Sequence, residues 1–242
     1  MKPVRLGMIV PSSNTVVEQE TCASLAGLDF VSAHFARFKL TQISVADPAA
    51  AYYDSGVMLE AGKLLADSRC AVITWNGSAG GLVGFERDRR FVVELEAATA
   101  TPATTAALSV LDAFRSLGVR RFGLVTLNPP DMNERVSAHF AAEGFECVGS
   151  THRADLVDNF AMADVPSEAL AQAARECARA RPQAITVFGT NTRGAPIAAA
   201  LERELGIPVV DSVLAGLWGA LRRAGVDTRA LSARGRLFEL AP

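Results

Sequence analysis

The sequence predicts an α/β fold built on parallel sheets, and three observations lead to this class. Short apolar runs, which are typical of buried strands, alternate with stretches of helical period along all 242 residues. The runs are continuous rather than alternating, as expected for strands that helices cover on both faces. Parts of the pattern also occur twice, which predicts two similar lobes.

Five apolar runs are predicted strands, because they are rich in Val, Ile, Leu and Phe and end in turn-forming residues. They lie at 5–10, 71–75, 122–126, 184–188 and 207–210. Six stretches carry apolar residues three to four positions apart and are predicted helices. They lie at 56–67, 103–117, 134–143, 167–180, 195–205 and 213–224. A charged run at 85–99 leads into a further helical pattern and is most simply a solvated face.

Three pairs of segments indicate an internal duplication. TTAALSVLDAFRSLGV (104–119) corresponds to DSVLAGLWGALRRAGV (211–226), RLGMIVPSSN (5–14) to RFGLVTLNPP (121–130), and VITWNGSA (72–79) to AITVFGTN (184–191). The pairs keep the same order at offsets of 107–116 residues. We therefore expect one lobe made of residues 1–103 plus 212–242, and a second lobe made of residues 104–211.

Four predicted strands end in loops of small polar residues before a helix begins. The loops are PSSNT (11–15), NGSAGG (76–81), LNPPDMN (127–133) and GTNTRG (189–194). Ligands of open α/β sheets bind beyond the carboxyl ends of the strands, so we expect all four loops around one cleft between the lobes. Each loop can also simply cap its own helix. Several helix N-termini converging on one cleft would favour an anion, and a small carboxylic acid is the expected partner.

The small and polar residues of these loops are the predicted substrate-binding residues. They are Ser12, Ser13, Asn14, Asn76, Gly77, Ser78, Asn128, Gly189, Thr190 and Asn191. Asp211, near the start of the last helix, is the candidate general base, although helix capping is the simpler role. A substrate carboxylate could pair with Arg193 in GTNTRG, or with Arg87 or Arg90 in the charged run. A surface salt bridge is an equally ordinary role for each of these arginines.

Other function classes lack support. Neither glycine-rich loop has GxGxxG spacing, and no GxxxxGK[ST] or GxSxG motif occurs, so we expect no cofactor and no hydrolase triad. Four scattered cysteines and three distant histidines predict no metal site. A net charge of −2 without a basic stripe predicts no nucleic-acid or membrane partner. With no apolar segment near the roughly 18 residues of a spanning helix and no signal peptide, we expect a cytoplasmic protein.

The chain resembles maleate cis-trans isomerases and arylmalonate decarboxylases, which belong to the aspartate/glutamate racemase superfamily. The segments that carry the resemblance, in order and spacing, are GMIVPSSNTVVEQE, VITWNGSAGG, LNPPDMNERV, LVDNFAMADVP, GTNTRGAPIAAALERELGIPVVDS and LAGLWGALRRAG. The resemblance implies two pseudo-symmetric flavodoxin-like lobes that close on a small carboxylic acid without a cofactor. It also implies a homo-oligomer.

The resemblance also indicates what this chain lacks. In the isomerases one cysteine from each lobe faces the substrate, and the decarboxylases keep only the second. These two positions correspond to Gly77 and Gly189, and a family tyrosine corresponds to Asn128. Glycine is neither a nucleophile nor an acid. Because such groups each supply about 10²–10⁴-fold in rate, isomerisation by the family route should be lost.

Three functional hypotheses follow. The first is a cofactor-independent enzyme that acts on a small mono- or dicarboxylic acid by thiol-independent chemistry, as a lyase, a decarboxylase or a hydrolase. The second is a non-catalytic relative that senses or sequesters such an acid. The third is an ordinary isomerase or racemase whose thiol is misaligned by a few residues, with Cys70 as the candidate. We favour the first, because the polar donors of the loops are retained.

Overall fold

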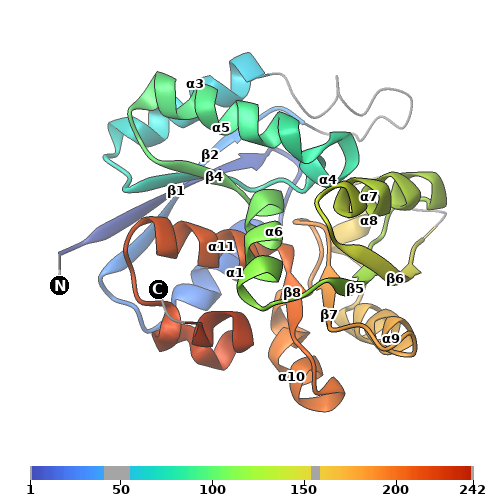
Figure 1. Ribbon diagram of the computed structural model, residues 1–242. Helices are drawn as coiled ribbons and strands as arrows, with labels where there is room; N and C mark the ends of the chain where they lie inside the picture. Colours follow the sequence, from blue (N-terminus) through green and yellow to red (C-terminus); the bar gives the residue numbers. More distant parts are fainter. Residues whose placement is uncertain (1, 41–54, 154–158, 241–242) are drawn as a thin grey trace.

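Two four-stranded parallel sheets with flanking helices form the protein (Figure 1). The computed structural model describes residues 2–40, 55–153 and 159–240. The strand orders are β2-β1-β3-β4 and β6-β5-β7-β8, and each of these strand pairings is parallel. The predicted α/β class with two parallel sheets is confirmed. In these described ranges, no helix has the length and apolar character needed to span a bilayer.

The first sheet is built by the N-terminal part of the chain. Its strands are β1 (Val4–Pro11), β2 (Val31–Phe38), β3 (Val72–Trp75) and β4 (Ala103–Thr105). The helices of this part are α1 (Val17–Leu25), α3 (Ser55–Asp67), α4 (Ala79–Val83) and α5 (Phe85–Thr99). Strand β1 is central, since it pairs with β2 along its whole length and with β3 on its other edge.

The second sheet repeats this arrangement. Its strands are β5 (Arg121–Val125), β6 (Glu146–Thr151), β7 (Ala184–Val187) and β8 (Val209–Asp211). The helices of this part are α6 (Ala106–Ser116), α7 (Pro130–Ala142), α8 (Asn159–Ala163), α9 (Ser167–Ala178), α10 (Ala195–Leu205) and α11 (Ser212–Arg223). Two 3₁₀ helices, η1 (Thr228–Arg234) and η2 (Arg236–Glu239), follow. Here β5 takes the central place, between β6 and β7.

The predicted elements all coincide with observed ones, with one correction. The five predicted strands lie on β1, β3, β5, β7 and β8, and the six predicted helices on α3, α6, α7, α9, α10 and α11. The prediction of helix from residue 103 is wrong, because residues 103–105 form β4 and pair with β3. Helix α6 begins after Thr105, whose hydroxyl accepts the N–H of Leu108 at 3.0 Å.

Helices α6 and α11 exchange places between the two halves of the molecule (Figure 1). Helix α6 follows the first sheet, yet its Phe114 packs on Phe122 and Phe145 of the second half, with ring centroids 5.1 and 5.4 Å apart. Helix α11 follows the second sheet but contacts α1, β3 and β4. The two helices touch closely, because a Cβ at Gly219 would lie 2.3 Å from the Ser109 hydroxyl. The predicted lobe boundaries assume this exchange and stay a prediction.

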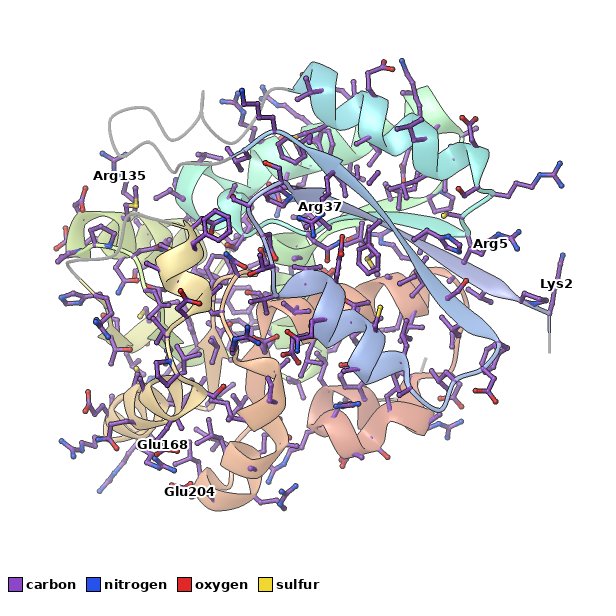
Figure 2. All side chains as sticks on the ribbon, turned by 180° about the vertical axis from the view of Figure 1, so that it is seen from behind. Lys2, Arg5, Arg37, Arg135, Glu168 and Glu204 are labelled. Atoms are coloured by element: carbon purple, nitrogen blue, oxygen red, sulfur yellow. The ribbon has the colours of Figure 1, made fainter. Side chains whose placement is uncertain are left out.

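Charged side chains of both signs project from the outer surface. Figure 2 labels Lys2, Arg5, Arg135, Glu168 and Glu204 at the periphery, whereas Arg37 lies near the centre of the view, on β2. The largest hydrophobic cluster runs through both halves and includes residues from both sheets together with α6 and α11. The interior between the two sheets is therefore one continuous packed core.

Candidate functional site

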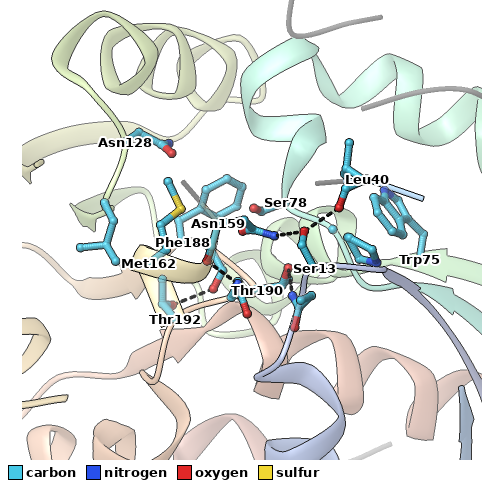
Figure 3. A pocket seen from close by; sticks show the side chains of 16 residues that line it. Ser13, Leu40, Trp75, Ser78, Asn128, Asn159, Met162, Phe188, Thr190 and Thr192 are labelled. Carbon is cyan, nitrogen blue, oxygen red and sulfur yellow. Dashed lines mark hydrogen bonds between the residues drawn. The ribbon is translucent and has the colours of Figure 1, made fainter. Parts of the chain in front are cut away.

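A small cavity of about 60 Å³ lies between the lobes, where the loops after β1, β3, β5 and β7 meet (Figure 3). Its lining residues are Pro11, Ser13, Asn14, Leu40, Trp75, Gly77, Ser78, Leu127, Asn128, Asn159, Met162, Phe188, Gly189, Thr190, Asn191 and Thr192. All four predicted loops contribute. Every predicted substrate-binding residue lines the cavity except Ser12 and Asn76, and the binding role of these residues stays a prediction.

Ser12 and Asn76 support the loops from outside the cavity. The hydroxyl of Ser12 accepts the N–H of Leu40 at 3.1 Å, so it joins the first loop to the end of β2. The Asn76 amide is almost fully buried and donates to the carbonyl of Thr74 at 3.2 Å and to the sulfur of Met8 at 3.1 Å. Both side chains thus shape the backbone that carries their neighbours.

Asn14 links the first loop to its own helix and to the opposite lobe. Its side-chain oxygen accepts the N–H groups of Val16 and Val17, each at 3.0 Å, which satisfies donors at the start of α1. Its amide nitrogen donates to the hydroxyl of Thr190 at 3.4 Å. The polar capacity of this side chain is therefore largely used within the protein.

Asn191 and Asn159 make a second set of links between the lobes. The Asn191 oxygen accepts the N–H of Thr15 at 3.0 Å, and its amide donates to the carbonyl of Asn159 at 2.6 Å. The Asn159 amide in turn donates to the hydroxyl of Ser13 at 2.8 Å (Figure 3). Such a buried, mutually satisfied set fixes the distance between the two walls of the cavity.

Arg37 on β2 braces the first loop from behind. Its Nη1 donates to three carbonyl oxygens of the loop, those of Pro11 (3.2 Å), Ser12 (3.1 Å) and Asn14 (2.9 Å). The same guanidinium pairs with Glu18 of α1 at 2.9 Å. These bonds fix the backbone of the loop that carries Ser13 and Asn14 into the lining of the cavity.

Arg37→Met is expected to lower the free energy of unfolding by about 1.5–3 kcal/mol, the usual range for hydrogen bonds to a charged group. The control is Arg90→Met on α5, since Arg90 is exposed and makes a weaker ion pair with Glu86, with the nitrogen and oxygen 3.6 Å apart. We expect the control to stay within about 0.5 kcal/mol of the parent protein. Urea unfolding of both variants measures the difference, and equal stabilities would show that Arg37 does not brace the loop.

Some polar groups of the lining retain hydrogen-bonding capacity for a ligand. Within the described part of the chain, the Ser78 hydroxyl and the Asn128 amide make no hydrogen bond, and Thr190 donates its hydroxyl proton to no acceptor. No Lys, Arg or His is found among the described lining residues. A carboxylate in this cavity would therefore be held by neutral donors, which suit an oxyanion in a site that excludes water.

Gly77 and Gly189 are structurally equivalent, because each lies two residues beyond the last residue of β3 or β7. Their surroundings differ. A Cβ at Gly77 would lie 2.2 Å from the nearest carbon of the Trp75 ring. Among the described residues, a Cβ at Gly189 would meet only Thr192, with its methyl carbon at 3.2 Å. A side chain at Gly189 thus needs only a small movement of Thr192, whereas one at Gly77 has no space while Trp75 keeps its position.

The described lining of the cavity contains no cysteine. Cys70 precedes β3, so it lies at the end of that strand opposite to Gly77, and burial raises the pKa of its thiol. Cys177 on α9 is also buried, which raises its pKa to about 11. Cys22 lies exposed on α1 and Cys147 lies in β6. The hypothesis of a misaligned thiol requires a cysteine at the cavity, and none of the four thiols lies there.

Asp211 has the geometry of a helix cap and does not line the cavity. Its Oδ1 accepts the N–H groups of Val213 (2.9 Å) and Leu214 (3.0 Å) at the start of α11. The carboxyl is fully buried, and this burial raises its pKa to about 7; the two N–H groups lower it and the nearby Glu20 raises it. Its Oδ2 accepts no hydrogen bond from the described residues.

The three candidate arginines also lie away from the cavity. Arg193 donates to the carbonyl of Ala163 on α8 at 3.0 Å and to Gln19 on α1 at 3.2 Å, so it ties the loop after β7 to both helices. Arg87 and Arg90 lie on the exposed side of α5, in a separate groove with Glu86. Arg193 therefore positions a loop of the site without lining it.

Sequence reasoning missed the apolar part of the lining and helix α8. Trp75 and Phe188 end two of the predicted strands, and Leu127 begins a predicted loop, so counting the apolar residues at these ends as lining would have found them. Asn159 and Met162 come from α8, within the segment LVDNFAMADVP that carried part of the resemblance. Residues 156–158 of that segment lie outside the described residues.

Comparisons with known proteins agree with this geometry. The family model described as arylmalonate decarboxylase matches residues 6–238. Arylmalonate decarboxylase of Bordetella bronchiseptica is 30% identical over 97% of this chain and 96% of that protein. A mutant maleate cis-trans isomerase of Nocardia farcinica, with a covalently bound succinylcysteine intermediate, has a TM-score of 0.88 at 26% identity, covering 97% and 98% of the two chains.

A liganded double mutant of arylmalonate decarboxylase has a TM-score of 0.85 at 26% identity, over 98% of this chain and 99% of that one. Both structures superpose over nearly the whole length, so the likeness covers the two lobes together and not a single sheet. The sequence match likewise spans all four loops of the cavity. The chain therefore belongs to the arylmalonate decarboxylase and maleate isomerase family of cofactor-independent enzymes.

Proposed function

We propose that this protein is an enzyme that acts on a small mono- or dicarboxylic acid by thiol-independent chemistry, and that decarboxylation is its best-supported reaction. The observation that carries the proposal is a cavity with neutral donors on both walls and no cysteine in its described lining. The covalent succinylcysteine of the Nocardia relative has no counterpart among these lining residues. A thiol-based isomerisation is therefore disfavoured.

Decarboxylation suits the groups that are present. When a malonate-type acid loses CO₂, the electron pair of the broken C–C bond passes into the remaining carboxylate, which becomes an enediolate, and water then supplies one proton to carbon. No base is needed, and none of the described lining residues is Asp, Glu, His or Lys. The developing charge needs only preorganised donors such as Ser78 and Thr190, and each donor of this kind is worth about 10²–10³ in rate.

The test is turnover of a panel of acids followed by NMR in deuterated water. The panel contains malonate, 2-alkyl- and 2-arylmalonates, maleate and ring-opened dicarboxylic amides. We expect loss of CO₂ with one deuterium placed on carbon, and no effect of iodoacetamide on the rate. Ser78→Ala and Thr190→Val should each lower kcat/KM by about 10²-fold. Ser232→Ala, at an exposed position of the 3₁₀ helix η1, should leave kcat/KM unchanged.

A non-catalytic acid-binding protein is the second candidate, and it is favoured by the same absence of a general base from the described lining. It predicts saturable binding of a small acid without product or deuterium exchange across the panel, and that result would contradict the enzyme proposal. Loss of turnover on alkylation would instead support a thiol mechanism. The three hypotheses thus give different results in one assay.

A further inference from the structure

Trp75, at the end of β3, lines the cavity (Figure 3). Its ring lies beside Gly77. A Cβ built on Gly77 would lie 2.2, 2.4 and 2.9 Å from the ring carbons Cζ2, Cε2 and Cη2. The indole therefore fills the volume into which a side chain at position 77 would project. The space on this wall is set by an aromatic ring at the end of β3, the strand that leads into the loop of Gly77.

The ring is held firmly in this place. Trp75 is fully buried, and its ring packs on Phe38 of β2 with centroids 5.2 Å apart and planes at 56°. Its backbone is fixed as well, since Trp75 pairs with Ile9 on one side and Thr105 on the other. A buried side chain packed in this way does not move aside without leaving a void. The indole is thus a fixed boundary of the cavity.

The remaining space is small. The cavity volume of about 60 Å³ is well below the roughly 150 Å³ of an apolar cavity that holds a benzene ring. The wall at Gly189 is less crowded, because a Cβ there meets only Thr192 among the described residues, at 3.2 Å. The described cavity therefore leaves little space for a ligand, and each further heavy atom of a substituent competes for volume with the side chains of the lining.

We infer that Trp75 is a specificity-determining residue that restricts the site to compact acids of the malonate and methylmalonate type. The inference rests on the proposed function for the identity of the ligand as a carboxylic acid. It goes further by naming the residue that limits ligand size and the substituents that are rejected. The ring acts by occupying volume, so trimming it should admit a larger substituent while Ser78 and Thr190 stay in place. Trimming also removes the indole N–H, which has no partner among the described residues, and the control at Trp218 loses an equally unpaired N–H.

The test compares binding of methylmalonate and phenylmalonate by calorimetry, alongside turnover of each by NMR. We expect the parent protein to bind methylmalonate at least about 10-fold more tightly, since excluding a group from a packed site is worth at least about 1.4 kcal/mol. Trp75→Leu should reduce this ratio at least 10-fold or reverse it, and Trp75→Phe should change it less in the same direction. Trp218→Leu is the control, since Trp218 is equally buried but lies on α11 outside the cavity.

The possible outcomes separate this inference from the proposed function. Equal affinities of the parent for the two acids, or an unchanged ratio in both Trp75 variants, would overturn the role of Trp75 even if turnover is observed. The expected ratios without any turnover would support the role of Trp75 and contradict the enzyme proposal. If the parent binds neither acid, both are overturned. Thermal unfolding of each variant shows that the protein measured is folded.

Discussion

Replacing Asp211 by asparagine should stabilise the protein at pH 8 by up to roughly 4 kcal/mol, and the gain should shrink toward zero as the pH falls to about 4. Burial raises the pKa of this carboxyl from 3.8 to about 7 in the folded state. A pKa difference of one between the folded and unfolded states corresponds to about 1.36 kcal/mol, which sets the upper limit. Asparagine keeps an oxygen that can accept the N–H groups of Val213 and Leu214.

The sign follows from proton binding. Between pH 3.8 and about 7 the folded protein holds a proton on Asp211 that the unfolded chain has released, so stability falls as the pH rises through this window. Above pH 7 the folded state contains an ionised, fully buried carboxylate near Glu20. Asparagine cannot ionise, and the variant therefore loses this part of the pH dependence.

Urea unfolding at pH 5 and pH 8 measures the effect. Asp227→Asn is the matched control, because Asp227 also caps a helix but is exposed, and Arg229 holds its pKa at about 2. The control should show no gain at pH 8. Asp88, whose pKa burial likewise raises to about 7, is present in all the proteins, so its titration cancels. A gain for Asp211→Asn that is equal at both pH values would refute the explanation.

Gly77→Ala is expected to destabilise the protein by about 1–3 kcal/mol, the usual penalty for overpacking a core. Its methyl group would lie 2.2 Å from the Trp75 ring, which must shift into the cavity or away from Phe38. Gly189→Ala is the matched control on the other wall, where the nearest atom is the Thr192 methyl at 3.2 Å. Neither glycine has a positive φ, so alanine strains neither backbone.

Thermal and urea unfolding compare the two alanine variants, and Gly189→Ala should cost less than Gly77→Ala, since its methyl group requires only a small shift of Thr192. The double variant Gly77→Ala/Trp75→Leu should be less destabilised than the sum of its single variants, since the methyl group then occupies space that the ring has left. Equal losses for the two glycines, or additivity in the double variant, would show that Trp75 does not fill the space beside Gly77.

The central strands could be predicted from the sequence, because continuous apolar runs such as those of β1 and β7 indicate buried strands. Edge strand β2, with the sequence VSAHFARF, could not, because polar residues such as His34 and Arg37 interrupt its apolar positions. Strand β4 was hidden for another reason. Thr104 and Thr105 are polar residues, so their sequence does not indicate burial. They are buried because β4 pairs with β3 and because Thr105 caps α6.

The loops of the site could also be predicted, because turn residues at strand ends need only local information. The hydrogen-bond partners of the loop side chains could not be predicted. Asn14 bonds to Thr190, which is 176 residues away, and nothing near Asn14 specifies that contact. Asn76 has the same chemistry and a similar position, yet its amide turns to Met8. Side-chain direction and burial depend on the packing of both lobes, whereas the cap of Asp211 is local and follows from its place just before α11.

The exchange of α6 and α11 affects the order in which the two lobes can fold during synthesis. During synthesis the first sheet leaves the ribosome long before α11, which it needs to cover β3 and β4. Its apolar face stays without that cover until the chain has grown to Arg223. In contrast, α6 has already been synthesised when β5, the first strand of the second sheet, emerges. The C-terminal lobe can therefore complete itself first, and the lobe that begins the chain is the last to close.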